Sequence, residues 1–221
     1  MLSFQRMIAR WRAHSNHTPL SPTLINCWHD SPKLKKALWK QFDFLVVDTE
    51  TSSLHPQDGE LLSIGWVVIR QGSIQLNSSR HLMIRPSQSV GDSATIHQLR
   101  DCELNEGITE AEMMTQLIDA AQGKILVFHH ASLDLRFLNA ACQRCLGGPL
   151  LLPTLDTLQI EKQRLERRNQ PIVQNALRLG SCRARYNLPI YPAHNALVDA
   201  LATAELLIAQ FSHQWTKEDK K

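Results

Sequence analysis

The chain has 221 residues, of which 43% are hydrophobic and 20% are charged, so it can bury the core of one ordinary domain. That composition excludes an intrinsically disordered protein. No apolar run reaches the roughly 20 residues that a membrane-spanning helix needs, so we expect a soluble protein.

The five cysteines are an odd number at irregular spacing and follow no hydrophobic leader, so we expect a reducing, cytoplasmic environment. Cys142 and Cys145 form a C-x-x-C motif. Because no second pair completes a zinc site, we interpret them as packing residues.

The formal net charge of +3 is unevenly distributed along the chain. Residues 1–40 carry seven Lys and Arg side chains against Asp30 alone, and the stretch from Lys162 to Arg185 carries seven against Glu166 alone. Such stretches are either solvated helix faces or contacts for a polyanion such as nucleic acid. The motifs described below favour the second interpretation.

The first residues predict a short basic amphipathic helix, with apolar side chains from Leu2 to Trp11 at helical spacing. It is either a helix that packs on the core or an organellar transit peptide, and we favour the packed helix. We treat residues 1–40 as a basic helical extension, 41–213 as the domain and 214–221 as a charged tail.

The domain begins with three successive strands, followed by alternating helices and strands. The predicted strands are Phe42–Asp48, Leu61–Arg70 and Ile74–Ile84, with a hairpin at Gln71-Gly72, and later Ile125–Phe128. The predicted helical stretches are Glu110–Ala121, Leu133–Cys145, Leu155–Arg168 and Ala196–Gln210. This order predicts an α/β fold with a mixed sheet flanked by helices.

Acidic residues stand at the ends of two predicted strands and near the start of the last helix. Asp48 and Glu50 are two residues apart, so on a strand both project to the same face. Asp134 falls in the first turn of the helix after the second of these strands, where it could also complement the helix dipole. His194 and Asp199 flank the start of the last helix and can share one of its faces.

The four acids have a common chemical use in phosphodiester hydrolysis. Two Mg²⁺ or Mn²⁺ ions about 3.5–4 Å apart can activate a water and stabilise the developing charge on phosphate. Such hard cations prefer oxygen ligands, which predicts Asp48, Glu50, Asp134 and Asp199 as the metal ligands. A histidine, whose ordinary pKa is near 6.5, is suited to take the proton from the attacking water, and we assign this role to His194.

In these motifs the chain resembles the DEDDh, or DnaQ-like, exonucleases, the family of the proofreading epsilon subunit of bacterial DNA polymerase III. The motifs are Asp48-Thr49-Glu50-Thr51, His129-His130-Ala131 leading to Asp134, and His194 with Asp199. The resemblance spans about Phe42 to Phe211. It implies an RNase H-like fold, with three antiparallel strands and then parallel strands, and 3′→5′ exonuclease activity.

The resemblance also assigns residue roles. It implies that Asp48 bridges both metals, that Glu50 and Asp199 hold the ion on the nucleophile side, that Asp134 supports the other ion and that His194 is the general base. The candidates for substrate contacts are Thr49, Thr51, Leu54, His97, His130, Arg167 and Arg168.

The chain departs from the family pattern at three places. Ser52-Ser53-Leu54 stands where Thr-Gly-Leu is common, and His130 replaces the usual Asn of the second motif. Ile96-His97-Gln98-Leu99 resembles an Ile-His-Gly-Ile element that touches the 3′ end in relatives, but it lacks the glycine. None of the five catalytic positions is altered.

The expected substrate is a single-stranded or frayed 3′ end, with DNA favoured over RNA. The alternatives are an exonuclease acting on RNA or oligoribonucleotides and a non-catalytic module that binds nucleic acid or a polymerase. A polymerase or repair partner fits the resemblance, although the extra residues at the N-terminus favour a stand-alone enzyme.

Overall fold

The computed structural model describes residues 2–15, 19–33, 39–86, 106–192 and 194–218. Its centre is a five-stranded sheet with the order β3-β2-β1-β4-β5. β1, β2 and β3 are antiparallel, whereas β4 runs parallel to β1 and β5 parallel to β4. The strands are β1 (Phe44–Thr51), β2 (Leu61–Arg70), β3 (Ser73–Met83), β4 (Ile125–Phe128) and β5 (Thr154–Asp156). The predicted mixed sheet of three antiparallel strands followed by parallel strands is confirmed.

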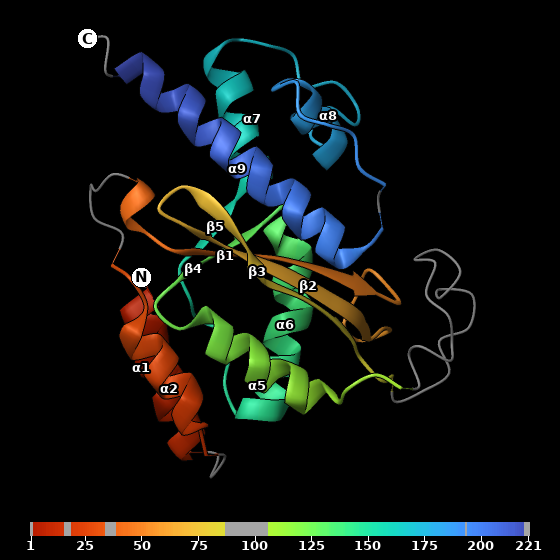
Figure 1. The fold of residues 1–221 in the computed structure, drawn as a ribbon. Coiled ribbons are helices and arrows are strands. Elements are labelled where there is room, and N and C mark those ends of the chain that lie inside the picture. The colour runs from red at the N-terminus through yellow and green to blue at the C-terminus, as the bar shows by residue number, and fades with distance from the viewer. Residues whose placement is uncertain (1, 16–18, 34–38, 87–105, 193, 219–221) are drawn as a thin grey trace.

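Helices cover both faces of the sheet (Figure 1). One face carries α9 (Ala196–Glu218), with α7 (Thr157–Arg167) and α8 (Leu179–Ala184) beside it. The other face carries α5 (Glu110–Ala121) and α6 (Ala131–Leu146). Near the N-terminus lie α1 (Leu2–Ser15), α2 (Pro22–Asp30) and the short 3-10 helix η1 (Trp39–Gln41).

Alternation along the central strand divides its apolar side chains between two core clusters. Leu45 and Val47 of β1 belong to the cluster under α5 and α6, whereas Phe44 and Val46 belong to the cluster under α9. Because side chains alternate along a strand, Asp48 and Glu50 continue the row that faces α9. The pattern of burial therefore sets the direction of the acidic pair.

Local sequence explains where several elements begin and end. The β2–β3 hairpin turns at Gln71 and Gly72, which both have positive φ angles of 52° and 75°, as a two-residue turn of this kind requires. Thr109 and Glu112 form a capping box at the start of α5. The predicted hairpin is confirmed, and each predicted strand and helix has a counterpart in the structure, with differences near some ends.

The two N-terminal helices are fastened to the domain in different ways. α2 buries Leu24, Cys27 and Trp28 in the core cluster that also holds α5 and α6, so the core is continuous across residue 40. α1 is held by the guanidinium of Arg6, which donates to the carbonyl oxygens of Trp28 (2.5 Å) and Leu151 (2.6 and 3.0 Å). The predicted N-terminal helix is thus a helix packed on the domain.

Three elements differ from the sequence expectation. α2 was not predicted as a separate helix, although Pro22 at its first position is compatible with a helix start. β5 overlaps the first two residues of the stretch Leu155–Arg168, which was expected to be helical, and α8 was also missed. Both are short, with three and six residues, so their periodic patterns are too brief to recognise.

Within the described residues, no helix is long and apolar enough to cross a membrane. Cys142 is fully buried, and burial raises the pKa of its thiol to about 12, which agrees with a packing residue.

Candidate active site

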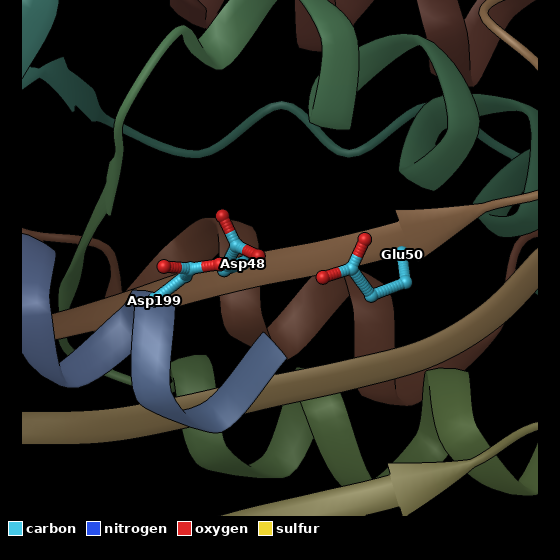
Figure 2. A group of neighbouring side chains, drawn as sticks. All are labelled: Asp48, Glu50 and Asp199. Atoms are coloured by element: carbon cyan, nitrogen blue, oxygen red, sulfur yellow. The ribbon is translucent and has the colours of Figure 1, made fainter. Parts of the chain in front are cut away.

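The acidic pair lies where the central strand passes under the first turn of α9. Asp48 and Glu50 come from β1, and Asp199 comes from the first turn of α9 (Figure 2). One carboxylate oxygen from each of the three lies within 4.8 Å of the others. Residues that are 151 positions apart in the sequence therefore form one acidic cluster.

Gly65 allows α9 to approach the sheet closely enough to form this cluster. It is the β2 partner of Asp48 in the antiparallel register. A Cβ atom at this position would lie 2.2 Å from the backbone nitrogen of Leu197 and 2.3 Å from the carbonyl carbon of Ala196. Only a residue without a side chain fits there, so the start of α9 rests directly on β2 beside Asp48.

Asp134 reaches the site from α6, on the other face of the sheet. Its Oδ1 accepts a hydrogen bond from the Thr49 hydroxyl at 2.7 Å and from the Thr49 amide at 3.1 Å. Thr49 lies between Asp48 and Glu50 on β1, so its side chain points to the face opposite theirs. β1 thus carries the carboxylates of Asp48 and Glu50 on one face, and through Thr49 on its other face it holds Asp134 by hydrogen bonds.

Burial and mutual repulsion make the carboxyl groups harder to ionise. Burial raises the pKa of Asp48 well above its ordinary value, and the charges of Asp134, Asp199 and Glu50 raise it further. Burial also raises the pKa of Asp134 to about 7, although the hydrogen bonds from Thr49 oppose the shift. The pKa of Asp199 is raised by burial, against the hydrogen bond from the His194 amide.

This donor set suits a divalent cation. Carboxylate oxygens are the ligands preferred by Mg²⁺ and Mn²⁺, and a bound cation offsets the repulsion that helps to raise the pKa values of Asp48 and Asp199. Asp48, Glu50 and Asp199 can hold one ion together. Asp134 lies outside the group that shares the 4.8 Å limit, but its charge acts on Asp48.

Two histidines stand just before the helices that carry acids, His130 one residue before α6 and His194 two residues before α9, and both have positive φ angles. His194, with φ of 69°, donates its amide hydrogen to Oδ2 of Asp199 at 2.9 Å. His130, with φ of 73°, donates its amide hydrogen to Oδ1 of Asp156 at 3.0 Å. Positive φ is uncommon for a side chain of this size, and such strain often occurs at functional sites. Both residues are exposed.

The remaining predicted contact residues lie in different settings. The Thr49 hydroxyl is bonded to Asp134, and the Thr51 hydroxyl donates to the Ser53 carbonyl at 2.7 Å. Leu54, in the loop after β1, is 66% exposed. His97 lies outside the described residues.

Arg167 and Arg168 are exposed at the end of α7 and form no ion pair with any residue that the structure describes. Other basic residues of the same stretch are engaged internally. Arg164 and Arg185 pair with the fully buried Glu161, and Arg183 pairs with Glu205. Part of the excess positive charge therefore stabilises the packing of α7, α8 and α9.

Sequence reasoning missed two residues that shape the site, Gly65 and Asp156. Asp156 accepts hydrogen bonds from the amides of His130 and Ala131, which begin α6, and from the amide of Leu158 in α7. A signal for Asp156 was present, because Asp before a helical run is a preferred N-cap. Its second role, in α6, depends on tertiary contacts that the sequence does not reveal.

Comparisons with known proteins identify the fold and the family. An exonuclease family model, that of RNase T, matches residues 45–207. The chain is 28% identical over 190 residues to a "DNA polymerase III PolC-type" protein of Thermotoga petrophila, covering 86% of this chain but only 13% of that protein. It is 26% identical over 179 residues to the "DNA polymerase III subunit epsilon" of Treponema pallidum, covering 80% of each.

Among solved structures, the zinc-bound complex of E. coli exonuclease I with single-stranded DNA is similar, with a TM-score of 0.68. Its sequence identity is 16%, and the match covers 81% of this chain and 42% of that chain. Similarity at this level supports the fold, which is that of RNase H-like exonucleases.

Proposed function

The chain belongs to the exonuclease family, and from this premise we propose that it removes nucleoside monophosphates from the 3′ end of DNA in a metal-dependent reaction. The acidic cluster is the observation that carries the proposal. Asp48, Glu50 and Asp199 converge within 4.8 Å, and Asp134 is fixed beside them by Thr49. These are the four acids that the family motifs require.

Each acid has a role in this proposal. Asp48, Glu50, Asp134 and Asp199 would hold two Mg²⁺ or Mn²⁺ ions. When bound, such ions stabilise the negative charge that develops on the phosphate and lower the pKa of a coordinated water. The Thr49 hydrogen bonds keep Asp134 oriented toward β1.

His194 is proposed as the general base. Its backbone is fixed by the bond from its amide to Asp199, and its charge opposes the rise that burial causes in the pKa of that carboxyl. An exposed ring beside the acidic cluster can take a proton from the attacking water and release it to solvent.

The comparisons favour DNA as the substrate. The relatives named above are DNA polymerase III proteins, and the similar exonuclease I was solved with single-stranded DNA. We propose a single-stranded or frayed 3′ end as the substrate and treat RNA as an outcome to be tested. A polymerase partner is suggested by the names of the relatives.

Digestion of end-labelled nucleic acid tests the proposal. The substrates are 5′-labelled and 3′-labelled DNA and RNA, single-stranded and duplex, with Mg²⁺, Mn²⁺ or EDTA. We expect 5′-labelled DNA to shorten stepwise and 3′-labelled DNA to release its label at once as a mononucleotide. EDTA should abolish both reactions.

Asp48→Asn is the decisive variant, because it removes a charge from the centre of the cluster at nearly constant volume. We expect it to lower the rate at least 10³-fold, and the exposed Asp119→Asn on α5 is the matched control. Full activity in excess chelator, or in Asp48→Asn, would contradict the metal-dependent mechanism. Release of the 5′ label first would contradict the polarity.

A further inference from the structure

A cavity of about 440 Å³ lies at the start of α6, the helix that carries Asp134, and none of Asp48, Glu50 and Asp199 lines it. It is bounded by the start of α6, the start of α7 and the segment 172–179. His130 lines it, and Asp134 follows His130 by about one helical turn. A ligand in this cavity would therefore lie close to the proposed reaction centre without contacting Asp48 or Asp199, which do not line it.

The cavity is apolar and partly open to solvent. Leu158, Leu179, Ile172 and Val173 line it, and no Asp or Glu does. Ile172 is 38% exposed and Val173 is 66% exposed, although both are large apolar side chains. Neighbouring exposed apolar residues at the mouth of a cavity indicate a surface that a ligand covers.

Partly buried hydrogen bonds hold the wall of the cavity in place. His129 Nε2 lies 2.9 Å from the Leu177 carbonyl oxygen, and its Nδ1 lies 2.8 Å from the Thr157 hydroxyl. Burial lowers the pKa of His129, so the neutral ring donates to Leu177 through Nε2 and accepts from Thr157. Arg185 donates to the Ala176 carbonyl at 2.7 Å. The cavity is thus preformed.

Polar groups at the cavity suit a polyanion. Arg178 lines it, is exposed and makes no ion pair with a described residue. Asn175 and His130 supply further hydrogen-bonding groups. The apolar wall offers a packing surface to the flat face of a base, and the cationic side chain offers a contact to a phosphate of a single strand.

We propose that this cavity binds a nucleobase of the substrate strand upstream of the cleaved bond. This inference rests on the proposed function, because an exonuclease that cuts off the 3′-terminal nucleotide holds that nucleotide at the acids. The strand that remains continues only in the 5′ direction. The base lies against Ile172 and Val173, and Arg178 contacts the adjoining phosphate.

The proposal has a consequence for substrate choice. A base enters the cavity only if it is not paired, because pairing would keep it stacked in a duplex. The cavity thus favours single-stranded 3′ ends over blunt duplex ends.

The double variant Ile172→Ser/Val173→Ser tests the proposal, since both side chains are exposed and their replacement should leave the fold intact. The substrates are oligothymidylates of two to eight nucleotides and thymidine 5′-(4-nitrophenyl phosphate), which presents only the terminal nucleotide. We expect kcat/KM for the longest oligomer to fall roughly tenfold, the scale of one lost base contact, with a much smaller effect on the nitrophenyl ester. Leu76→Ser, which replaces an apolar residue of β3 about as exposed as Val173, is the control.

The other outcomes overturn the proposal in distinct ways. Equal losses on the ester and on long oligomers would assign the cavity to the terminal nucleotide, and no loss on any substrate would assign it to another ligand. If the wild-type protein cleaves neither substrate, the proposed function fails instead. In that case, fluorescence anisotropy of labelled octathymidylate in EDTA still tests whether the cavity binds the strand. An unchanged affinity in the double variant would show that the cavity is not part of the binding surface.

Discussion

Asp134 is a carboxyl group that the fold makes difficult to ionise. Its pKa is about 7 in the folded protein, against an ordinary value of 3.8. A group whose pKa is raised by folding contributes stability that is fully present below the unfolded pKa and is lost as the pH rises through the folded pKa. Without metal, the contribution of Asp134 should therefore disappear between about pH 4 and pH 7.

Asp134→Asn should remove that dependence, because an amide keeps an acceptor for Thr49 but does not titrate. In urea unfolding with EDTA, we expect the wild-type protein to lose stability relative to Asp134→Asn between about pH 4 and pH 7. Burial lowers the pKa of His129, so this residue makes the folded protein less stable as the pH falls below the ordinary pKa of histidine. This effect is common to both proteins and cancels in the difference between their free energies of unfolding. If the difference in the free energy of unfolding between the two proteins does not change with pH, Asp134 is ionised in the folded protein over the whole pH range measured.

His194→Ala tests the assignment of the general base. We expect the rate to fall roughly 10²–10⁴-fold while DNA binding remains close to wild type, because the variant keeps the backbone amide that bonds to Asp199. Rates come from single-turnover digestion and affinities from titration in EDTA, with the exposed His29→Ala on α2 as control. A near-wild-type rate in His194→Ala would show that His194 is not the general base and serves only to position the start of α9.

At the residue scale, the acids and the histidine could be predicted because their motifs are local in sequence. Asp48 and Glu50 were placed on one strand face by the alternation of apolar residues around them. The bond between Thr49 and Asp134 could not be predicted in the same way, because it joins positions 85 residues apart. Nothing local to either residue specifies that contact.

At the scale of elements, long periodic segments were predictable and short ones were not. β2 and α5 were located to the residue, because β2 is an almost continuous apolar run of ten residues and α5 repeats its apolar residues at helical spacing over twelve. β5 has three residues, and its Asp156 belongs to a strand while also capping two helices. The close packing of α9 on β2 could not be predicted either, because a glycine within a strand does not show which other part of the backbone packs against it.

Gly65→Ala should therefore damage the site through the position of α9. The added methyl group would lie 2.2–2.5 Å from backbone atoms of Ala196 and Leu197, so the helix start and Asp199 must shift. We expect activity to fall at least tenfold, with a loss of about 1–3 kcal/mol in the free energy of unfolding from overpacking.

The matched control is Gly180→Ala in α8, where a new Cβ atom meets nothing within 4 Å. It should leave activity and stability close to wild type, since alanine favours a helix more than glycine does. Equal activity in Gly65→Ala and Gly180→Ala would show that the acidic cluster tolerates movement of α9.

At the scale of the whole molecule, positive charge serves two purposes. Arg6, Arg164, Arg183 and Arg185 bind carbonyl or carboxylate oxygens within the protein and join α1, α7, α8 and α9 to their neighbours. Arg167, Arg168 and Arg178 make no such ion pairs among the described residues. Sequence composition could identify the basic stretch, but it could not show which of its arginines form internal ion pairs and which remain free of them. That depends on which acids the fold brings near, such as Glu161 and Glu205.

The basic residues that remain at the end of α7 should contact the phosphates of the substrate. We expect Arg167→Ala/Arg168→Ala to weaken binding of single-stranded DNA alike for all sequences, because phosphate contacts carry no base information. For single strands, the slope of log affinity against log salt changes by about 0.7 per phosphate contact, so two lost contacts should flatten it by about 1.4. Arg10→Ala/Arg12→Ala on α1 removes the same charge at exposed positions and separates a local contact from a change in net charge. An unchanged slope in the α7 variant, or the same change in both variants, would make Arg167 and Arg168 part of a solvated helix face.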